Sequence, residues 1–592
     1  MENTNRYNSN KSIVVLPFVN MSADPDNEYF SDGITEEIIN ALTNVRGLKV
    51  IARTSSFAFK NRNEDVRSIG KKLEVGTILE GSVRKVKKRV RITAQLINTK
   101  DGGHIWSKNF DREIDDIFAL QDEISLLIAD QIRENYGHFD IQNHLVEAST
   151  QKIEAYNLYL KGRYHQLKWN IDSFNLAISY YNEATKIDPS YAIPYFGLVQ
   201  CYSYLFMWQA ITKIEAIKQT TIYLNKLKLT RTNLPEYHLA LSNCAILLHW
   251  NLKLAHAELN KTLSINPSNI DALEALSGLY IVIGSFNEGV AIIDKALEIN
   301  PLSANHSFMK GNIFFYANEY KNAIEWMDIA IQLNPNLHLA HQVKMACLLL
   351  VKKDKEFNVC FDQNKQFSFA HNFWRLKNLI QGNGEKSWQK EDYKSEFLPW
   401  ELYYATQSGK LDHAFALLKT GLENQIGQYF CFRHDPFLTP LREDKRFQQI
   451  KLEHPELDIK PIKSKILRGK SLIKMETDEI KTALNALVCF MDDEEGYLNP
   501  QLSLKSLSDK INVHPNKLSW LLNEHVGKNF NEYINTFRLE AFKHKALDKT
   551  YTHLTLFGLA YECGFNSKTV FNAFFKNNTG KTPSEWVREN KK

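Results

Sequence analysis

Cysteine is scarce in this sequence, and its few positions are not grouped. Seven cysteines occur in 592 residues, and no two of them form a CxxC pair; they are Cys201, Cys244, Cys347, Cys360, Cys431, Cys489 and Cys563. Structural zinc sites and thiol redox motifs use such close pairs. The scattered spacing therefore argues against a zinc site and a disulfide framework, and it fits the reducing environment of a cytoplasm.

Long apolar stretches are missing as well. The first residues, MENTNRYNSNK, lack the apolar run of a signal peptide. Nowhere do about 18 apolar residues follow one another, so no membrane-spanning helix is expected. Hydrophobic residues make up 44% of the chain and charged residues 24%, as in globular proteins. We expect a cytoplasmic protein without membrane contact, divided into three or more domains because of its length.

The motifs of several common enzyme classes are also absent. The sequence contains no HExxH, GxSxG or GxGxxG. Gly580-Lys581-Thr582 is similar to the end of a phosphate-binding loop, but Phe575 stands where that loop begins with glycine and Pro583 follows it. We therefore expect no enzymatic activity, no metal and no cofactor. The enzymatic alternative is a nucleotide-handling activity in the first 137 residues, which has no phosphate loop or metal-ligand group behind it.

The small net charge is unevenly distributed. It is +5 overall, yet residues 501–592 hold 14 lysines and arginines against 8 aspartates and glutamates. The 500 residues before them sum to −1. A basic end on a nearly neutral chain is the electrostatic pattern of a nucleic-acid-binding domain.

Residues 11–137 alternate between strand and helix patterns, which predicts an α/β domain. Residues 12–18 form the short apolar run of a buried strand, and residues 77–86 and 89–98 alternate apolar and polar residues around a Lys87-Lys88 turn. Further strands are expected over 48–52 and 104–110, and helices over 30–42, 65–73 and 117–132. The basic hairpin is interpreted as an exposed turn, with a nucleic-acid or anionic-ligand patch as the alternative; it holds Lys85, Lys87, Lys88, Arg89 and Arg91.

Three pieces of this domain carry a resemblance to a known module. They read VLPFVNMSADPDNEYFSDGITEEI, VGTILEGSVRK and GGHIWSKNFDR. The segment resembles the TolB-amino-terminal-like module found ahead of tetratricopeptide arrays in bacterial regulators and adenylate-cyclase-like proteins. The resemblance implies an α/β fold and no established chemistry.

Prolines recur at regular intervals in the middle of the chain. Pro267, Pro301 and Pro335 are 34 residues apart. Alanines stand five or twelve residues before a proline of this series or before Pro189, and they are Ala177, Ala184, Ala255, Ala296, Ala323 and Ala330. Small residues let two antiparallel helices approach closely, and the proline ends each unit. This tetratricopeptide pattern predicts an all-α superhelix over residues 150–447, with a protein or peptide partner on its concave face. The lysine-rich residues 448–474 predict a linker.

Residues 475–592 contain two helix-turn-helix patterns. The first is LSLKSLSDKINVHPNKLSWLLNEHVGKNF and the second is LTLFGLAYECGFNSKTVFNAFFKNNTGKTP. In each, a short helix leads through a turn, Asn512-Val513 or Gly564-Phe565, to a second helix that ends at a glycine. A helix presented in this way fits the DNA major groove, where base edges carry a readable pattern.

These two pieces, joined by GKNFNEYINTFRLEAFKHKAL, resemble the AraC family of bacterial transcription regulators over the family's whole module of seven helices. The resemblance implies a carboxyl-terminal all-α domain that binds double-stranded DNA with two major-groove helices. Family members commonly contact RNA polymerase when they activate transcription, so RNA polymerase is a further possible partner.

The periodicity of the two units separates core from surface. We expect core positions at Leu504, Leu507, Ile511, Leu518, Leu521, Leu522, Leu556, Leu559, Ala560, Val570, Phe571 and Phe574. Cys563 is interpreted as a small core residue. The outward side chains are the DNA-binding candidates, and they are Asn516, Lys517, Ser519, Trp520, Asn523, Ser567, Lys568, Thr569, Asn572 and Lys576.

The candidates have different expected roles. By the family pattern, Asn516, Ser519 and Trp520 face bases in the first unit, as do Lys568, Thr569 and Asn572 in the second. Asparagine can hold adenine through two hydrogen bonds, and lysine can donate to guanine. Many family members carry arginine at the position of Trp520 and at or near that of Ala573, so base preference in both halves stays open. For every candidate the alternative is a solvated helix face.

The sequence as a whole predicts a bacterial, sequence-specific transcription regulator. Its α/β domain and tetratricopeptide superhelix would sense or recruit a partner and modulate DNA binding, an assignment that rests on fold-level analogy. The alternative is a tetratricopeptide scaffold or adaptor that is tethered to DNA by its carboxyl-terminal domain.

Overall fold

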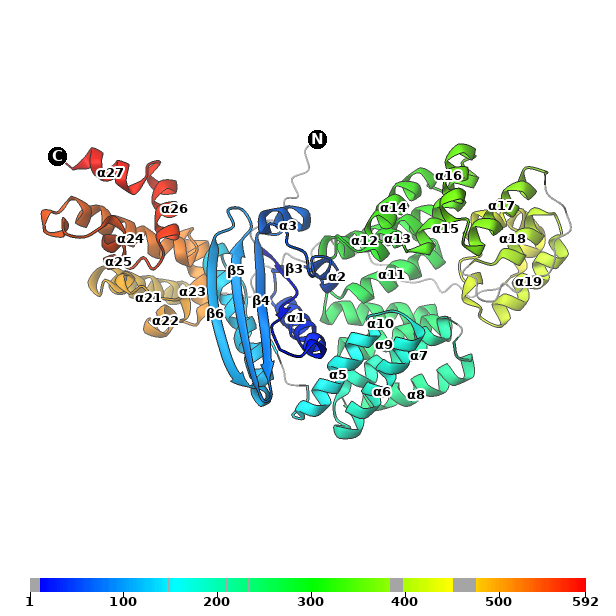
Figure 1. Ribbon diagram of the computed structural model, residues 1–592, viewed down its shortest axis with the longest axis horizontal. Coiled ribbons are helices and arrows are strands. Elements are labelled where there is room, and N and C mark those ends of the chain that lie inside the picture. Colours follow the sequence, from blue (N-terminus) through cyan, green and yellow to red (C-terminus); the bar gives the residue numbers. More distant parts are fainter. Residues whose placement is uncertain are drawn as a thin grey trace.

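The computed structural model describes residues 11–146, 149–208, 210–230, 234–383, 398–450 and 475–591. Figure 1 shows an α/β domain in the middle, a helical array on one side and a smaller helical domain on the other. The chain order is α/β domain, array, helical domain, so the carboxyl-terminal domain returns past the array to reach the α/β domain. The expected multidomain fold, α/β followed by two all-α regions, is confirmed.

The α/β domain is a mixed sheet with helices on both faces. Its elements are β1 (Ser12–Val15), β2 (Val19–Asn20), α1 (Glu28–Thr43), β3 (Lys49–Val50), α2 (Arg53–Phe57), α3 (Val66–Leu73), β4 (Thr77–Val86), β5 (Arg89–Asn98), β6 (His104–Glu113) and α4 (Ile117–Tyr136). The strand order is β3-β1-β4-β5-β6, with β2 beside β4. Strand β1 pairs in parallel with β3 and β4, whereas β4, β5 and β6 are antiparallel.

Strand β1 is apolar throughout because both of its faces are covered. Ile13 and Val15 join the core beneath α1 and α4, and Val14 packs on the opposite face with α3. The hairpin turns at Lys87, whose φ is +53°. Arg89 and Arg91 of this hairpin both form ion pairs with Asp111 on β6, which supports the exposed-turn interpretation.

The array consists of helices that pack mostly as antiparallel pairs. They are α5 (Ile153–Gln166), α6 (Ile171–Ile187), α7 (Ala192–Met207), α8 (Lys213–Thr230), α9 (Pro235–Leu247), α10 (Leu252–Ile265), α11 (Ile270–Ile283), α12 (Phe286–Ile299), α13 (Ala304–Tyr316), α14 (Tyr320–Leu333), α15 (His338–Leu350), α16 (Asp354–Asn364), α17 (Ser368–Ile380), α18 (Trp400–Gln407) and α19 (Leu411–Glu423). Pro267, Pro301 and Pro335 each lie between two pairs, as expected. The six alanines at the regular intervals before the prolines are fully buried.

The end of the array folds back towards its beginning. The side-chain amide of Gln425 donates to the carbonyl oxygen of His249 at 3.1 Å, and the rings of Phe430 and Trp250 lie 4.6 Å apart. Phe447 and Ile450 still pack against the array. Most of the linker that we predicted over 448–474 lies outside the described residues.

The array is joined to the α/β domain through apolar contacts. Tyr156 and Leu160 of α5 belong to the same buried cluster as α1 and α4, and Ala52 joins a cluster of the array. Leu160 lies so close to Gly33 of α1 that a Cβ added there would stand 2.7 Å from its Cδ2. These two domains therefore behave as one packed body.

The carboxyl-terminal domain has the seven expected helices. They are α21 (Thr477–Val488), α22 (Leu504–Lys510), α23 (Pro515–Leu521), α24 (Phe530–Leu547), α25 (Leu556–Glu562), α26 (Lys568–Thr579) and α27 (Pro583–Asn590). Helix α24 contributes to two separate cores, one around α22 and α23 and one around α25 and α26. It is thus the rod that holds two compact helix-turn-helix units.

Candidate nucleic-acid interface

The two turns have the backbone geometry that a helix-turn-helix needs. Asn512 and Gly564 have φ values of +53° and +93°, in the left-handed region that ends one helix and starts the next at an angle. Both recognition helices are capped at their first turn. His514 Nδ1 accepts from the amide of Asn516 at 3.2 Å, and Ser567 Oγ accepts from the amide of Val570 at 3.4 Å.

The second recognition helix, α26, presents the expected face to solvent. Lys568, Thr569, Asn572 and Lys576 are all exposed, and Ser567 is half-buried as the cap. Their spacing places the four exposed side chains within one arc of the helix, beside the apolar stripe that holds the buried rings of Phe571 and Phe575. This face combines amide, hydroxyl and ammonium groups, which suit base edges and phosphate oxygens.

One core expectation in this unit is wrong. Val570 is 41% exposed, although we expected it in the core. It precedes Phe571 by one residue, and one residue turns a helix by about 100°, so Val570 lies at the border of the apolar face. Cys563 is buried as expected, and burial raises the pKa of its thiol to about 11. The thiolate that a nucleophile requires is therefore disfavoured.

The two units are held together by polar contacts. Arg538 of α24 donates from Nε to the carbonyl of Tyr497 and from Nη2 to that of Asn499, both at 2.8 Å. Burial lowers the pKa of this guanidinium to about 10. The side-chain amide of Asn566 donates to the carbonyl of Pro500 at 3.1 Å. These bonds join α24 and the turn of the second unit to the segment that precedes the first unit.

The first recognition helix, α23, has a different environment. Asn516, Lys517, Trp520 and Asn523 are half-buried, and Lys517 pairs with Glu479 of α21. Trp520 packs edge-on against His525, with ring centroids 5.1 Å apart. Ser519, which we expected to face outward, is 2% exposed, and this expectation is wrong for the arrangement seen here.

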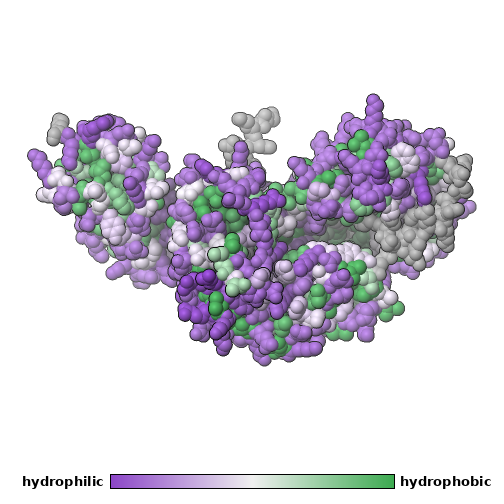
Figure 2. Space-filling model, viewed as in Figure 1, coloured by the Kyte–Doolittle hydropathy of each residue, from purple (hydrophilic) through white to green (hydrophobic). Residues whose placement is uncertain are grey.

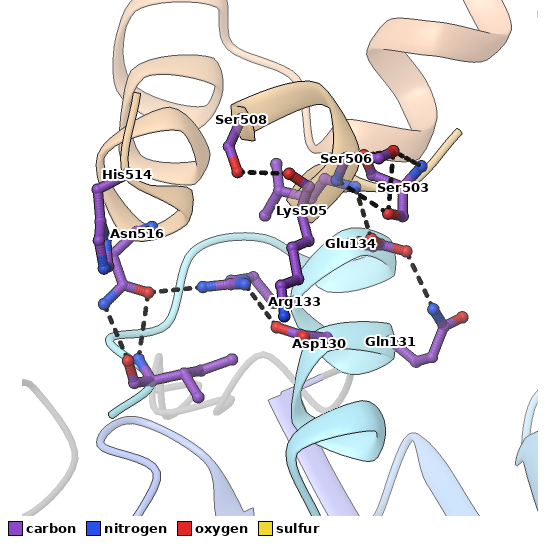
Figure 3. A network of polar contacts seen from close by, with 12 residues as sticks. Asp130, Gln131, Arg133, Glu134, Ser503, Lys505, Ser506, Ser508, His514 and Asn516 are labelled. Atoms are coloured by element: carbon purple, nitrogen blue, oxygen red, sulfur yellow. Dashed lines mark hydrogen bonds and ion pairs between the residues drawn. The ribbon is translucent and has the colours of Figure 1, made fainter. Parts of the chain in front are cut away.

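The α/β domain covers this face of the first unit. Figure 3 shows the carboxyl-terminal turns of α4 beside α22 and α23. Asn516 Oδ1 accepts from Arg133 Nη1 at 2.6 Å and from the amide of Ile141 at 3.4 Å, and its Nδ2 donates to the Ile141 carbonyl at 3.0 Å. Ser519 lies between Asn516 and Asn523 on the same face and is buried.

Further contacts extend this interface to both sides. Glu134 Oε1 accepts from the amide of Leu504 at 2.7 Å. Asn529 and Asn531 both donate to Asn135, one to its carbonyl and one to its side-chain oxygen, each at 3.0 Å. No local sequence signal marks these residues, because Asp130, Arg133 and Glu134 have the spacing of the polar face of an ordinary amphipathic helix.

A large cavity lies inside the array, and it is the candidate site for the expected partner. Its volume is about 2730 Å³, and it is lined by α1 and α2, by the inner helices α7, α9, α11 and α13, and by the returning segment around Phe430. Figure 2 shows the recess between the part of the array that holds α7 and α8 and the part that holds α13 and α14. The returning segment contributes one wall of this cavity through Gln425, Ile426, Gly427, Tyr429, Phe430 and Cys431.

The cavity wall near α1 is rich in carboxylates. Arg163 of α5 pairs with Glu36 at 3.0 Å, and Arg53 approaches Glu36 at 3.3 Å. Glu37 and Asp271 also line the cavity, and neither pairs with a cation among the described residues. Burial, with the neighbouring Glu36 charge, raises the pKa of Glu37 to about 7, and burial raises the pKa of Asp271.

Metal-binding clusters and membrane-spanning helices are both missing from the described ranges. There, no group of three or more histidine, cysteine, aspartate or glutamate side chains could hold a metal ion. Within the same ranges, no helix combines the length and apolar character needed to cross a membrane.

Two families match parts of the sequence. Residues 507–589 match the helix-turn-helix domain family, and residues 166–191 match a tetratricopeptide repeat family. The chain therefore carries an AraC-type helix-turn-helix domain at its carboxyl-terminal end and tetratricopeptide repeats in its middle. These domains indicate DNA-binding transcription regulation and protein interaction. The resemblance of residues 11–137 to the TolB-amino-terminal-like module stays a prediction.

Individual relatives cover smaller parts of the chain. A Rhizobium meliloti (strain 1021) protein named "Putative adenylate cyclase 3" is 36% identical over 249 residues, 42% of this chain and 42% of that protein. An HTH-type transcriptional regulator of Staphylococcus aureus (strain COL) is 35% identical over 92 residues, 16% of this chain and 12% of that one. The chain thus spans less than half the length of these relatives.

Solved structures with a likeness to this chain include two that are described as tetratricopeptide repeat proteins. YrrB, described as having an unusual peptide-binding site, is 21% identical, with 33% of this chain and 98% of that one covered and a TM-score of 0.23. A repeat protein from Parabacteroides merdae is 12% identical, with 48% of this chain and 99% of that one covered and a TM-score of 0.29.

Proposed function

We propose that this protein is a sequence-specific transcription regulator of bacterial type that reads DNA through α26 and, when it is uncovered, through α23. The observation that carries the proposal is the exposed face of α26, where Lys568, Thr569, Asn572 and Lys576 stand together on a basic domain. An enzymatic role forms no part of the proposal. Selection of genomic fragments by the full-length protein, followed by footprinting, tests it; protection of no fragment at modest ionic strength would refute it.

Replacing Lys576 with alanine should weaken binding to every duplex. Its exposed ammonium lies one turn beyond Asn572 and is placed to contact a phosphate. The loss of one phosphate contact should lower the slope of log K against log salt concentration by about 0.9. The measurement is a salt titration of fluorescence anisotropy with a selected and with a mixed-sequence duplex. An unchanged slope would show that Lys576 does not approach the backbone.

We further propose that the array cavity takes an extended polypeptide segment that carries a basic side chain. Concave helical arrays bind extended chains, and the cavity is large enough for many residues. Glu37 and Asp271 supply the charge complementarity. The cavity wall includes α1 and α2 of the α/β domain, so a bound segment would also touch the domain that contacts α23. This is how a partner could influence DNA binding, and it favours a regulator over a passive DNA-tethered scaffold.

The affinity for a basic peptide should increase as pH rises from 6 to 8. Glu37 has a pKa near 7, so its carboxyl is largely protonated at pH 6 and ionised at pH 8; it is faced by Glu36, Arg163, Tyr159 and Glu236. A charge-assisted contact is worth about 1.5–3 kcal/mol, which corresponds to roughly tenfold or more in affinity. The probes are labelled Arg/Ala and Glu/Ala dodecapeptides. Glu37→Gln should remove the pH dependence; preference for the acidic peptide would contradict the proposal.

A further inference from the structure

We propose that the α/β domain is an intramolecular competitor for DNA at the first helix-turn-helix unit. The inference rests on the proposed DNA-binding function. In the arrangement seen here, the end of α4 and residues 137–141 cover the face of α23 that would meet a groove, whereas α26 stays open. In the full-length protein, one of the two DNA-reading helices is therefore covered and the other is accessible to a duplex.

The contact with Asn516 reproduces the hydrogen-bond pattern of a base edge. When asparagine holds adenine, its oxygen accepts from an N–H group and its amide donates to a ring nitrogen. Here the N–H and C=O groups of Ile141 take these two places, at 3.4 and 3.0 Å, and Arg133 adds a donor at 2.6 Å. The side-chain oxygen and amide of Asn516 that would hold a base are thus both engaged by the α/β domain.

The backbone contacts of the first unit are also engaged. Backbone N–H groups and asparagine side chains are among the donors that proteins direct at phosphate oxygens. In this structure the Leu504 amide donates to the Glu134 carboxylate, and Asn529 and Asn531 donate to Asn135. Asp130 interacts electrostatically with Lys505 on α22. An acidic helix end thus lies where the basic domain would face an anionic duplex.

The cover extends along the whole reading face of α23. At the amino-terminal turn it meets Asn516, and two turns further, just beyond the end of α23, it meets Asn523, whose Oδ1 lies 2.8 Å from the position that a Cβ on Gly137 would take. Ser519, between them, is buried. A DNA duplex and residues 133–141 cannot occupy this face at the same time.

The interface is polar, which makes it suited to release. No buried apolar cluster of the described residues includes side chains from both the α/β and the carboxyl-terminal domain, whereas the α/β domain and the array share two. Burial raises the pKa of Glu134 to about 7 and raises that of Asp130, so these carboxylates lose hydration in the contact. The cost of desolvating paired charges keeps such a contact weak. On release, the carboxyl-terminal domain therefore separates from the α/β domain and the array, which remain packed against each other.

The direct test uses a charge-neutral double variant of the full-length protein. Arg133→Ala with Glu134→Ala removes the two side chains that hold α23 and α22 without altering the net charge. We expect affinity for a labelled 40-base-pair mixed-sequence duplex to rise by about tenfold and the salt slope to steepen, as phosphate contacts of the first unit are added. The matched control is Arg112→Ala with Glu123→Ala, which removes an ion pair of 3.0 Å on the exposed side of the same domain. It should leave both quantities unchanged.

A reversible lock provides the opposite perturbation. Asn135→Cys with Asn531→Cys, in a background where the exposed Cys489 is serine, puts two cysteines at positions whose asparagine side chains are joined by a hydrogen bond of 3.0 Å. When oxidised, this protein should bind the duplex about tenfold more weakly than after reduction. The inference would be overturned by equal duplex affinities for the Arg133→Ala/Glu134→Ala variant, the wild-type protein and the oxidised cysteine variant. If none of them bound duplex DNA in a Lys576-dependent manner, the proposed function itself would fail.

Discussion

Replacing Gly564 with alanine should destabilise the carboxyl-terminal domain by about 2–5 kcal/mol and abolish DNA binding by both units. Gly564 has φ +93°, and a left-handed residue with a Cβ costs about 1–2 kcal/mol. The added Cβ would also stand 2.4 Å from the Tyr497 carbonyl and 2.8 Å from Arg538 Nε, and overpacking of this kind costs about 1–3 kcal/mol. The contact at risk is the one that fixes the two units relative to each other.

The measurement is hydrogen exchange of peptides from residues 475–591, combined with urea unfolding of the full-length protein. Gly580→Ala is the matched control, because Gly580 also has a positive φ, +73°, but no described heavy atom lies within 4 Å of the position that its Cβ would take. It should cost only the backbone strain, about 1–2 kcal/mol. Equal destabilisation by the two variants would show that the close approach of Gly564 to Tyr497 contributes nothing to the free-energy difference between them.

Asn572→Ala should reduce affinity for the selected DNA site by about 5- to 150-fold, which corresponds to the 1–3 kcal/mol of one bidentate base contact. Binding to a mixed-sequence duplex should change little, because that binding depends on phosphate contacts. Asn572 is exposed at the centre of the face formed by Lys568, Thr569 and Lys576. Anisotropy titrations with both duplexes give the two affinities.

Asn577→Ala serves as the control for this prediction. Asn577 is exposed on the same helix but points about 130° away from the centre of the reading face, as follows from 3.6 residues per turn. It should leave both affinities unchanged. Equal losses on both duplexes for Asn572→Ala would remove this residue from base reading and assign it to the solvated surface.

The two recognition helices are alike in sequence pattern but not in their surroundings. Residues 516–523 and 568–576 each follow a helix-turn-helix turn and carry polar outward positions, and nothing in the sequence distinguishes their environments. In the structure, one asparagine face is sealed by Ile141 and Arg133, and the other is open. A regulator built this way would respond to any partner that shifts the α/β domain, and the array cavity touches that domain through α1 and α2.

The elements that depend on neighbours in the chain were predictable from the sequence. Local periodicity and residues with one strong backbone preference predict four such features. They are the hairpin around Lys87, the helix pairs that end at a proline, the buried alanines before those prolines and the seven helices of residues 475–591. Even the choice of Lys568, Thr569 and Asn572 as surface positions follows from the 3.6-residue period. The exposure of Val570 shows the limit of that reasoning at the edge of an apolar face.

By itself, then, the sequence determined the kinds of helices and strands, the two helix-turn-helix units and the side chains they turn outward, because these depend on contacts within about 30 residues. Only the tertiary structure decided that Asn516 is covered and Ser519 buried, that the array and the α/β domain line one cavity, and that the α/β domain lies between array and DNA-binding unit. The physical reason is distance along the chain: Arg133 and Asn516 are separated by 383 residues, and no periodicity links two surfaces that meet only after folding.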